Sequence, residues 1–203
     1  TTEIYTLSLH DALPISVKAF ADLPHELIEL LERLVLQNSD FSENRNLQNL
    51  LILTAIKADK DRVMEYVNRL DNFDGPEIAK IAISDQYQLY EEGFIIYTKF
   101  AKKKAASSPA DDPGVVELHV LAVGVLVDLI GDIERANDYA ERVSVSEVWS
   151  RLAKAQLDTD AVAAAISSYI KAKDPSNFRE VIDAIERAGT YEAAVTYFVM
   201  ARQ

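Results

Sequence analysis

The sequence contains no cysteine, which excludes a disulfide scaffold, a cysteine-ligated zinc site and a thiol nucleophile within its 203 residues. Glycine and proline occur six times each and histidine three times. The glycines are scattered as turn punctuation, so no GxGxxG, Walker or GxSxG motif is present to bind phosphate or present a serine nucleophile. His25 and His119 are too far apart for an HExxH-type metal site.

The remaining titratable residues do not form a catalytic pattern. We expect His25 to be a first-turn surface residue and His119 a hydrogen-bonded helix residue. The acid pairs Glu91-Glu92 and Asp111-Asp112 are sequence neighbours, and neighbours on a helix do not face each other. We therefore predict no catalytic, cofactor-binding or metal-binding residues, and we do not expect an enzyme.

Basic charge is also scarce. The chain has 33 acidic and 21 basic side chains, for a formal net charge of -12. Phosphate recognition needs clustered Lys and Arg, so general nucleic-acid binding is not expected. Hydrophobic residues make up 49% of the chain, which is sufficient for a packed core. These features favour a folded intracellular protein.

The opening stretch, TTEIYTLSLHDALPIS, fits no targeting signal. A secretory signal starts with basic residues before an apolar stretch of roughly 7 to 15 residues, but the first basic side chain here is Lys18. A mitochondrial transit peptide would be rich in arginine, which this stretch lacks. Thr1–Ile15 instead matches the translation of a common short-read sequencing adapter letter for letter. We expect residues 1–16 to be a non-native leader without consistent packing, followed by the native domain at 17–203.

Helix signals dominate the rest of the chain. PHELIELLERLVLQN begins with Pro24 in the first turn and repeats leucine at helical spacing. RNLQNLLILTAIKA is apolar on more than one side, which predicts a helix between two layers. Asp74 and Asp174, each close to a proline, are predicted to be N-cap residues. Gly131 and Gly189 are predicted to end helices. Strand signals are weak, so we predict an all-α fold of about ten or eleven short helices.

An internal repeat is the most informative feature. RVMEYVNRL, ending at Leu70, aligns without a gap with RANDYAERV, ending at Val143, and matches Arg62 to Arg135. YEEGFIIY aligns with YEAAVTYF, and AAISSY adds a further copy. The recurring aromatics are spaced by about 30 residues except for one larger gap: Tyr66, Tyr97, Tyr139, Tyr169 and Phe198.

A second aromatic series, Trp149 and Phe178, precedes the first, so each period holds two helices. Hairpins of this length bury both faces only by stacking on neighbours, which predicts an α-solenoid of helical hairpins. Small residues before the rings, such as Ala136, Ala165 and Ala194, would allow close helix approach. We expect the aromatics to pack in the core and disfavour a ligand groove.

The larger gap contains AKKKAASSPADDPG, residues 101–114, which we predict to be an inserted mobile loop. We expect Lys102–Lys104 to form a solvated turn, with a site for an acidic partner or a lipid headgroup as the less favoured alternative. The most apolar run, Gly114–Gly131, contains Glu117, His119 and Asp128. Charges at the hydrocarbon centre are costly, so this run predicts a buried helix and not a membrane span.

The stretch DLPHELIELLERLVLQNSDFSENRNLQNLLILTAIKADKDRVMEYVNRLDNFDGPEIAKIAIS, residues 22–84, resembles the leg of clathrin heavy chains. IERANDYAERVSVSEVWSRLAKAQLDTDAVAAAISSYIKAKDPSNFREVI continues the resemblance, which covers nearly all of residues 17–203. It implies a right-handed α-solenoid and a structural role in the vesicle coat, as the distal leg to knee segment. The long 101–114 connection departs from the family, where this connection is short.

The resemblance also implies partners and a location. These are other heavy-chain legs in the cage, at the cytoplasmic face of coated pits and vesicles, with membrane association only indirect, through adaptors bound elsewhere. Whether a light chain contacts this segment is left open. The alternative is a helical-repeat scaffold of a vacuolar-sorting or tethering complex, and a less favoured one is a helical accessory domain of an enzyme.

Overall fold

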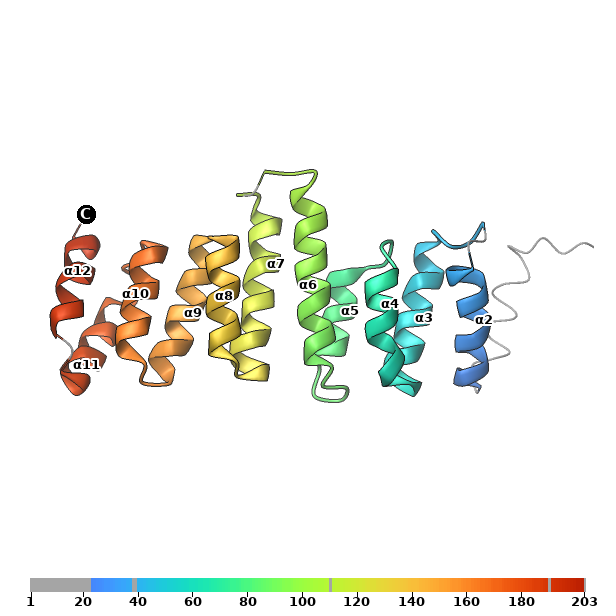
Figure 1. Cartoon of the computed structure of the whole chain (residues 1–203), viewed down its shortest axis with the longest axis horizontal. Helices are drawn as coiled ribbons and strands as arrows, with labels where there is room; N and C mark the ends of the chain where they lie inside the picture. The colour runs from blue at the N-terminus through green and yellow to red at the C-terminus, as the bar shows by residue number, and fades with distance from the viewer. Residues whose placement is uncertain (1–22, 38–39, 110, 190, 203) are drawn as a thin grey trace, which may run out of the picture. The chain divides into compact units, whose positions relative to one another are not determined.

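The computed structural model describes residues 23–37, 40–109, 111–189 and 191–202, which form eleven α-helices and no strand (Figure 1). The all-α prediction is thus confirmed, and the pairing of successive helices fits an α-solenoid of helical hairpins. The predicted leader, residues 1–16, lies outside the described residues. The chain divides into two compact units, residues 1–89 and 90–203, which are described in turn.

The first unit is built around a central helix. Its elements are α2 (Pro24–Leu36), α3 (Arg45–Ala58), the 3-10 turn η1 (Lys60–Arg62), α4 (Val63–Arg69) and α5 (Gly75–Ala82). Helix α3 packs against α2, α4 and α5. It buries side chains on several faces, among them Leu47, Leu51, Ile52 and Ile56. The prediction that this helix lies between two layers is confirmed.

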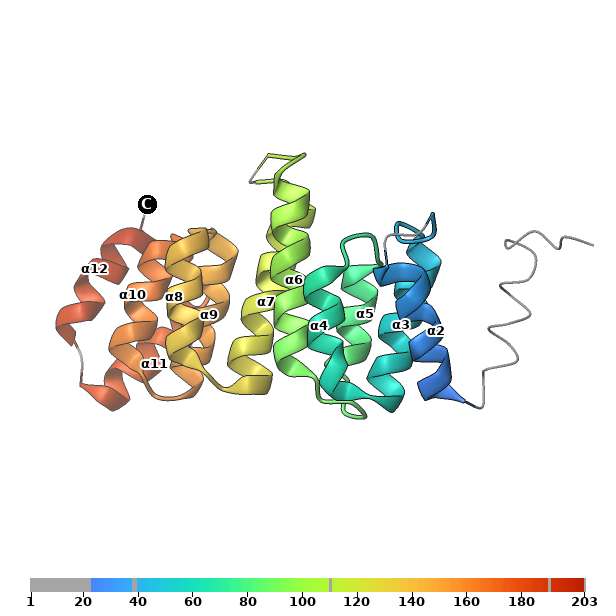
Figure 2. The same cartoon turned by 45° about the vertical axis from the view of Figure 1, so that its right-hand side comes forward.

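The second unit is a series of antiparallel helices (Figures 1 and 2). They are α6 (Tyr90–Ala105), α7 (Pro113–Gly124), the π-helical turn η2 (Val125–Ile130), α8 (Ile133–Val143), α9 (Ser146–Asp158), α10 (Val162–Ala172), α11 (Phe178–Ala188) and α12 (Tyr191–Ala201). Helix α9 contacts α7, α8 and α10, and α10 contacts α11 and α12. Each hairpin therefore packs on the next one along the chain.

Most predicted helix ends are correct. Gly131 and Gly189 adopt the left-handed conformation at φ +78° and +68°, which a glycine reaches without strain. Asp132 then caps α8, because its Oδ1 accepts the backbone N–H of Arg135 at 2.9 Å. The prediction for Asp174 was wrong: its Oδ1 accepts the N–H of Ser176 in a turn, and α11 begins only at Phe178.

The predicted loop at 101–114 is shorter in the structure. Helix α6 continues through Ala105 and α7 begins at Pro113, so only the residues between them connect the two helices. Lys102–Lys104 form the last turn of α6 and not a loop, which fits the preference for cations at helix C-termini. Ala101 is fully buried. The inserted residues thus lengthen a hairpin.

The apolar run is a helix with one buried side. By length and composition alone, Pro113–Ile130 passes for a membrane span. In the structure it packs against α6, α8 and α9. Its buried residues are Val115, Leu118, Ala122, Val123, Val125 and Leu126, while Val116, Val120 and Leu121 are half-buried. The prediction of a buried helix is confirmed for one side only.

The repeated aromatics fill the core with one change of register. Tyr66, Tyr97, Tyr139 and Tyr169 are buried, as predicted. In α12 the buried ring is Tyr197, with no exposed surface, whereas Phe198 is 37% exposed. The prediction for Phe198 was wrong because an ungapped alignment moved the repeat by one position, and one helical residue is about 100° of rotation.

Of the two residues in the second aromatic series, one is buried and the other is exposed. Trp149 is buried, but Phe178 lies at the start of α11 and is 40% exposed, with its ring stacked 6.3 Å from that of Tyr197. The small residues Ala136 and Ala165 are fully buried, as expected, and the side chain of Ala194 lies outside the described residues. The core formed by α9 to α12 thus contains the rings of Tyr169 and Tyr197 together with small residues such as Ala165.

The register of α12 is tested by truncating its two neighbouring rings. We expect Tyr197→Ala to lower the free energy of unfolding by about 3 kcal/mol, since it empties a buried site, and Phe198→Ala by less than about 1 kcal/mol. Tyr197→Phe should be neutral or stabilising, because the buried Tyr197 hydroxyl has no hydrogen-bond partner. Urea unfolding followed by circular dichroism measures all three, and equal losses for the two alanine variants would refute the assigned register.

Candidate functional site: contacts between successive hairpins

The residues with potential for chemistry do not converge. His25 is exposed on the first turn of α2, and His119 lies on α7 in the other unit. Among the described residues, no group of three or more His, Asp or Glu side chains could hold a metal ion. Glu91 and Asp112 each pair with a basic side chain, Arg135 and Lys104 respectively.

His119 has a structural partner, as predicted. Its Nδ1 lies 2.6 Å from the hydroxyl oxygen of Tyr139, so the two side chains join α7 to α8 by a hydrogen bond. Burial lowers the pKa of His119, and burial raises that of Tyr139 to about 12. The Arg142 guanidinium lies over the Tyr139 ring at 5.4 Å, and the Phe94 ring meets the same ring edge-on at 5.5 Å. This cluster joins α6, α7 and α8.

In the first unit, an ion pair and a tyrosine connect α2 to α4. Glu32 Oε1 accepts two hydrogen bonds. One is donated by the Tyr66 hydroxyl at 2.5 Å and the other by Nη1 of Arg62 at 3.2 Å. The Arg62 Nε lies 3.0 Å from Asp59 Oδ2. Burial, followed by the hydrogen bond to Glu32, raises the pKa of Tyr66 to about 12. The buried ring thus has its polar end tied to the preceding hairpin.

The same kind of contact connects α6 to α8 in the second unit. Arg135 donates to both carboxylate oxygens of Glu91, at 2.7 and 2.8 Å. Its guanidinium also lies 5.6 Å from the centre of the Phe94 ring and 3.9 Å from Asp132. The hydrogen bonds from Arg135 lower the pKa of Glu91. Two-point pairing fixes both distance and orientation, which a lysine would not do.

Between α8 and α10, the basic partner of the ion pair is a lysine instead of an arginine. Lys171 of α10 pairs with Glu141 of α8, and its ammonium lies 4.2 Å from the centre of the Trp149 ring. Arg187 of α11 lies 3.6 Å from Asp160, a looser and more exposed pair. Ion pairs therefore recur between successive hairpins, and we call them the inter-hairpin ion pairs: Glu32–Arg62, Glu91–Arg135, Glu141–Lys171 and Asp160–Arg187.

Sequence reasoning found the arginines but missed their partners. Arg62 and Arg135 align in the repeat, and each follows an aspartate by three positions and precedes the buried tyrosine by four. The pattern DxxRxxxY was therefore visible at 59–66 and 132–139. The glutamates could not be assigned because they lie 30 or more residues away on another helix.

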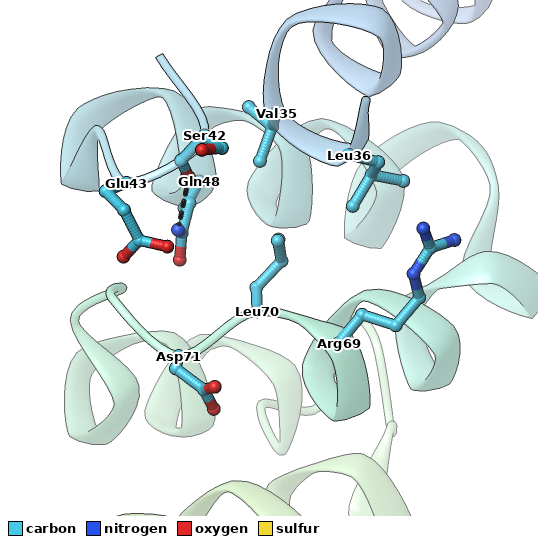
Figure 3. A pocket seen from close by; sticks show the side chains of 8 residues that line it. All are labelled: Val35, Leu36, Ser42, Glu43, Gln48, Arg69, Leu70 and Asp71. Atoms are coloured by element: carbon cyan, nitrogen blue, oxygen red, sulfur yellow. Dashed lines mark hydrogen bonds between the residues drawn. The ribbon is translucent and has the colours of Figure 1, made fainter. Parts of the chain in front are cut away.

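Two amides of α3 anchor the connection between α4 and α5. Gln48 is 2% exposed; its Nε2 donates to the carbonyl of Ser42 at 2.7 Å (Figure 3) and its Oε1 accepts the N–H of Asn72 at 2.8 Å. Asn49 exchanges two hydrogen bonds with Asp74, at 2.6 and 2.8 Å. Gln48 is buried and Asn49 half-buried, and amides bonded at both ends fix the path of a connection.

The depression beside Gln48 has a volume of about 130 Å³, and Figure 3 shows its lining: Val35, Leu36, Ser42, Glu43, Gln48, Arg69, Leu70 and Asp71. The Gln48 amide is already used in the fold, and Arg69 pairs with Glu65 at 2.7 Å. Two of the polar side chains that line the depression are therefore already engaged in the fold.

Comparison with known proteins matches the sequence to one family. The model described as "Region in Clathrin and VPS" matches residues 13–112. The chain is 50% identical over 195 residues to the clathrin heavy chain of Drosophila melanogaster, and 54% identical over 190 residues to clathrin heavy chain 2 of Oryza sativa. A probable clathrin heavy chain of Schizosaccharomyces pombe is 54% identical over 194 residues. These alignments cover 95%, 93% and 95% of this chain.

The chain belongs to the clathrin heavy-chain family. It spans about a tenth of the length of the curated relatives it matches, since the aligned share of each is 10% or 11%. The resemblance proposed from the sequence is thus confirmed. The inter-hairpin ion pairs and the Gln48–Asn49 anchor are the parts of this clathrin segment that link one helix pair to the next.

The Glu91–Arg135 pair should stabilise the clathrin segment modestly. Because both side chains are over 40% exposed, we expect Arg135→Ala to cost about 0.5–1 kcal/mol at pH 7. The folded-state pKa of Glu91 is lowered, so this contribution is full above the ordinary carboxyl pKa of 4.5 and is lost as pH falls through the folded value.

A double-mutant cycle with Glu91→Gln, measured by urea unfolding from pH 7 to pH 3, tests this expectation. The coupling energy should shrink as the pH drops below 4.5. A coupling energy that is zero at pH 7, or that grows in acid, would contradict it. Arg187→Ala, at the looser pair with Asp160, is the matched control and should have a smaller effect.

Proposed function

We propose that this chain is a structural segment of a vesicle coat, the distal leg to knee part of a clathrin heavy chain. In this role it supports cage assembly during endocytosis and intracellular vesicle transport. Its partners are other heavy-chain legs, and it acts at the cytoplasmic face of coated pits and vesicles. The observation that carries the proposal is identity of about 50% along nearly the whole chain with clathrin heavy chains of animals, plants and fungi.

The contacts between hairpins suit this role. A coat leg must be long and stiff while bending slightly, and stacked hairpins bend through small rotations between neighbours without opening the core. The buried tyrosines supply the cohesion within each unit. The inter-hairpin ion pairs lie at the surface, where such pairs contribute little energy, so small rotations between hairpins cost little.

Catalysis is not part of the proposal. Among the described residues, the partly buried His119 is engaged with Tyr139, while Glu91 of α6 and Asp112 at the N-cap of α7 pair with basic side chains. We propose that membrane contact is indirect and is mediated by other parts of the coat. Whether a light chain binds this segment is a separate question that the coat role does not decide.

A scaffold in a vacuolar-sorting complex is the second candidate, because the matching family model covers both clathrin and VPS proteins. The identity to clathrin heavy chains favours the coat role. The two are distinguished by association: a coat segment supports closed cages, whereas a tethering scaffold does not.

The proposal predicts that this segment functions inside a coat protein. We would replace the aligned part of the S. pombe heavy chain, which is 54% identical, with residues 17–203. Purified chimera should form cages in electron micrographs, and cells should take up a fluorescent endocytic tracer at a rate within about twofold of wild type.

A chimera with Tyr66→Ala and Tyr169→Ala is the matched control. It should lose cages, because each change empties a buried site in one unit. If the unmodified chimera is folded and soluble but forms no cages, the coat role is contradicted.

A further inference from the structure

The α6–α7 hairpin ends in a basic tip on an acidic chain. Lys102, Lys103 and Lys104 form the last turn of α6 and are all exposed. In Figures 1 and 2 this end of α6 and α7 extends past the ends of α8, α9 and α10. A projecting charged group is accessible to a partner in a way that a charge between helices is not.

The tip is held in a defined position. Lys104 Nζ lies 3.1 Å from Asp112 Oδ1, and the same oxygen accepts the N–H of Gly114 at 2.9 Å. A Cβ on Gly114 would lie 1.7 Å from the Lys104 ammonium, so a larger residue there would make the flexible end of the lysine side chain shift. Lys104 thus closes the tip onto the start of α7. Lys102 and Lys103 lie on the exposed surface, where the Lys103 ammonium is 5.6 Å from the centre of the Phe100 ring.

The charge distribution of the chain favours a second copy of the same chain as the partner of the tip. The formal net charge of the chain is -12, and the tip is locally basic, so the rest of the chain is more acidic still. Opposite charges on two copies steer association and fix register. A contact between a tip and a different acidic face is heterologous, the kind that extends into arrays.

An anionic membrane is a poorer match. Membrane-binding basic clusters usually contain four to eight Lys or Arg residues. Here Lys104 is paired with Asp112, and Asp111 lies beside it in sequence.

We propose that the lysine tip, Lys102–Lys104, docks on the acidic surface of a second copy of this chain. The proposal rests on the proposed coat function, and it identifies the part of the surface through which two legs meet. Lys102 and Lys103 supply the attraction, and Lys104 with Asp112 and Gly114 keeps the tip in place.

The test uses the complete heavy chain that contains this segment. The critical concentration for assembly is measured by sedimentation at several salt concentrations for wild type and for Lys102→Glu/Lys103→Glu. The control Lys57→Glu/Lys154→Glu changes net charge equally at exposed lysines on α3 and α9. The two glutamates of the charge-reversal variant could destabilise the helix C-terminus. Lys102→Gln/Lys103→Gln removes the positive charges without adding negative ones, and so separates loss of attraction from loss of helix stability.

We expect charge reversal at Lys102 and Lys103 to raise the critical concentration for assembly about three- to tenfold and to make it depend less on salt concentration. The glutamine variant should give a smaller rise, and the control should stay within about twofold of wild type. Equal effects at the tip and the control, or no effect at the tip, would overturn the proposal. Failure of wild type to assemble at all would overturn the coat function itself.

Binding to phosphatidylserine vesicles is measured in parallel. If reversal at the tip abolished vesicle binding but left assembly unchanged, the tip would be a lipid site and the proposal would be wrong. Vesicle binding that is weak and equal in all variants supports it.

Discussion

Burial of a tyrosine ring that recurs in each hairpin from α4 onward is the interaction on which the rest of the structure depends. Two helices of seven to sixteen residues cannot cover both of their apolar faces, so each hairpin is completed by its neighbour. Tyr97, Tyr139, Tyr169 and Tyr197 fill these positions in the second unit, and Tyr66 in the first. A fully buried side chain of this kind stabilises by roughly 1.5–3 kcal/mol.

The inter-hairpin ion pairs contribute in a different way from the buried tyrosines. Glu32, Glu91 and Glu141 each reach a basic side chain of a following hairpin. Exposed pairs of this type add little energy but do restrict geometry, the more so when arginine bonds both oxygens. The core therefore supplies the cohesion between hairpins, and the ion pairs select their relative orientation. A structural protein that must be stiff yet able to adjust is served by this division.

Much of the fold could be predicted from the sequence because its signals are local. Helical spacing, the glycines at 131 and 189 and the repeat of Tyr66 and Tyr139 all depend on residues within one or two turns. Errors arose where a position depends on distant packing. The ring of α12 was placed one residue too late, and residues 101–105 were assigned to a loop although they extend α6. The partners of Arg62 and Arg135 required the three-dimensional stack.

The central claim is that each hairpin is held by its neighbours, and native-state hydrogen exchange of the Tyr169→Ala variant tests it most directly. Loss of protection should be largest in α10, which holds this ring, and in α9, α11 and α12, which each pack against α10. It should be smaller in α8 and smallest in α6. Such a gradient is expected when stability is the sum of nearest-neighbour contacts. Loss confined to α10, or equal loss throughout residues 90–202, would contradict it.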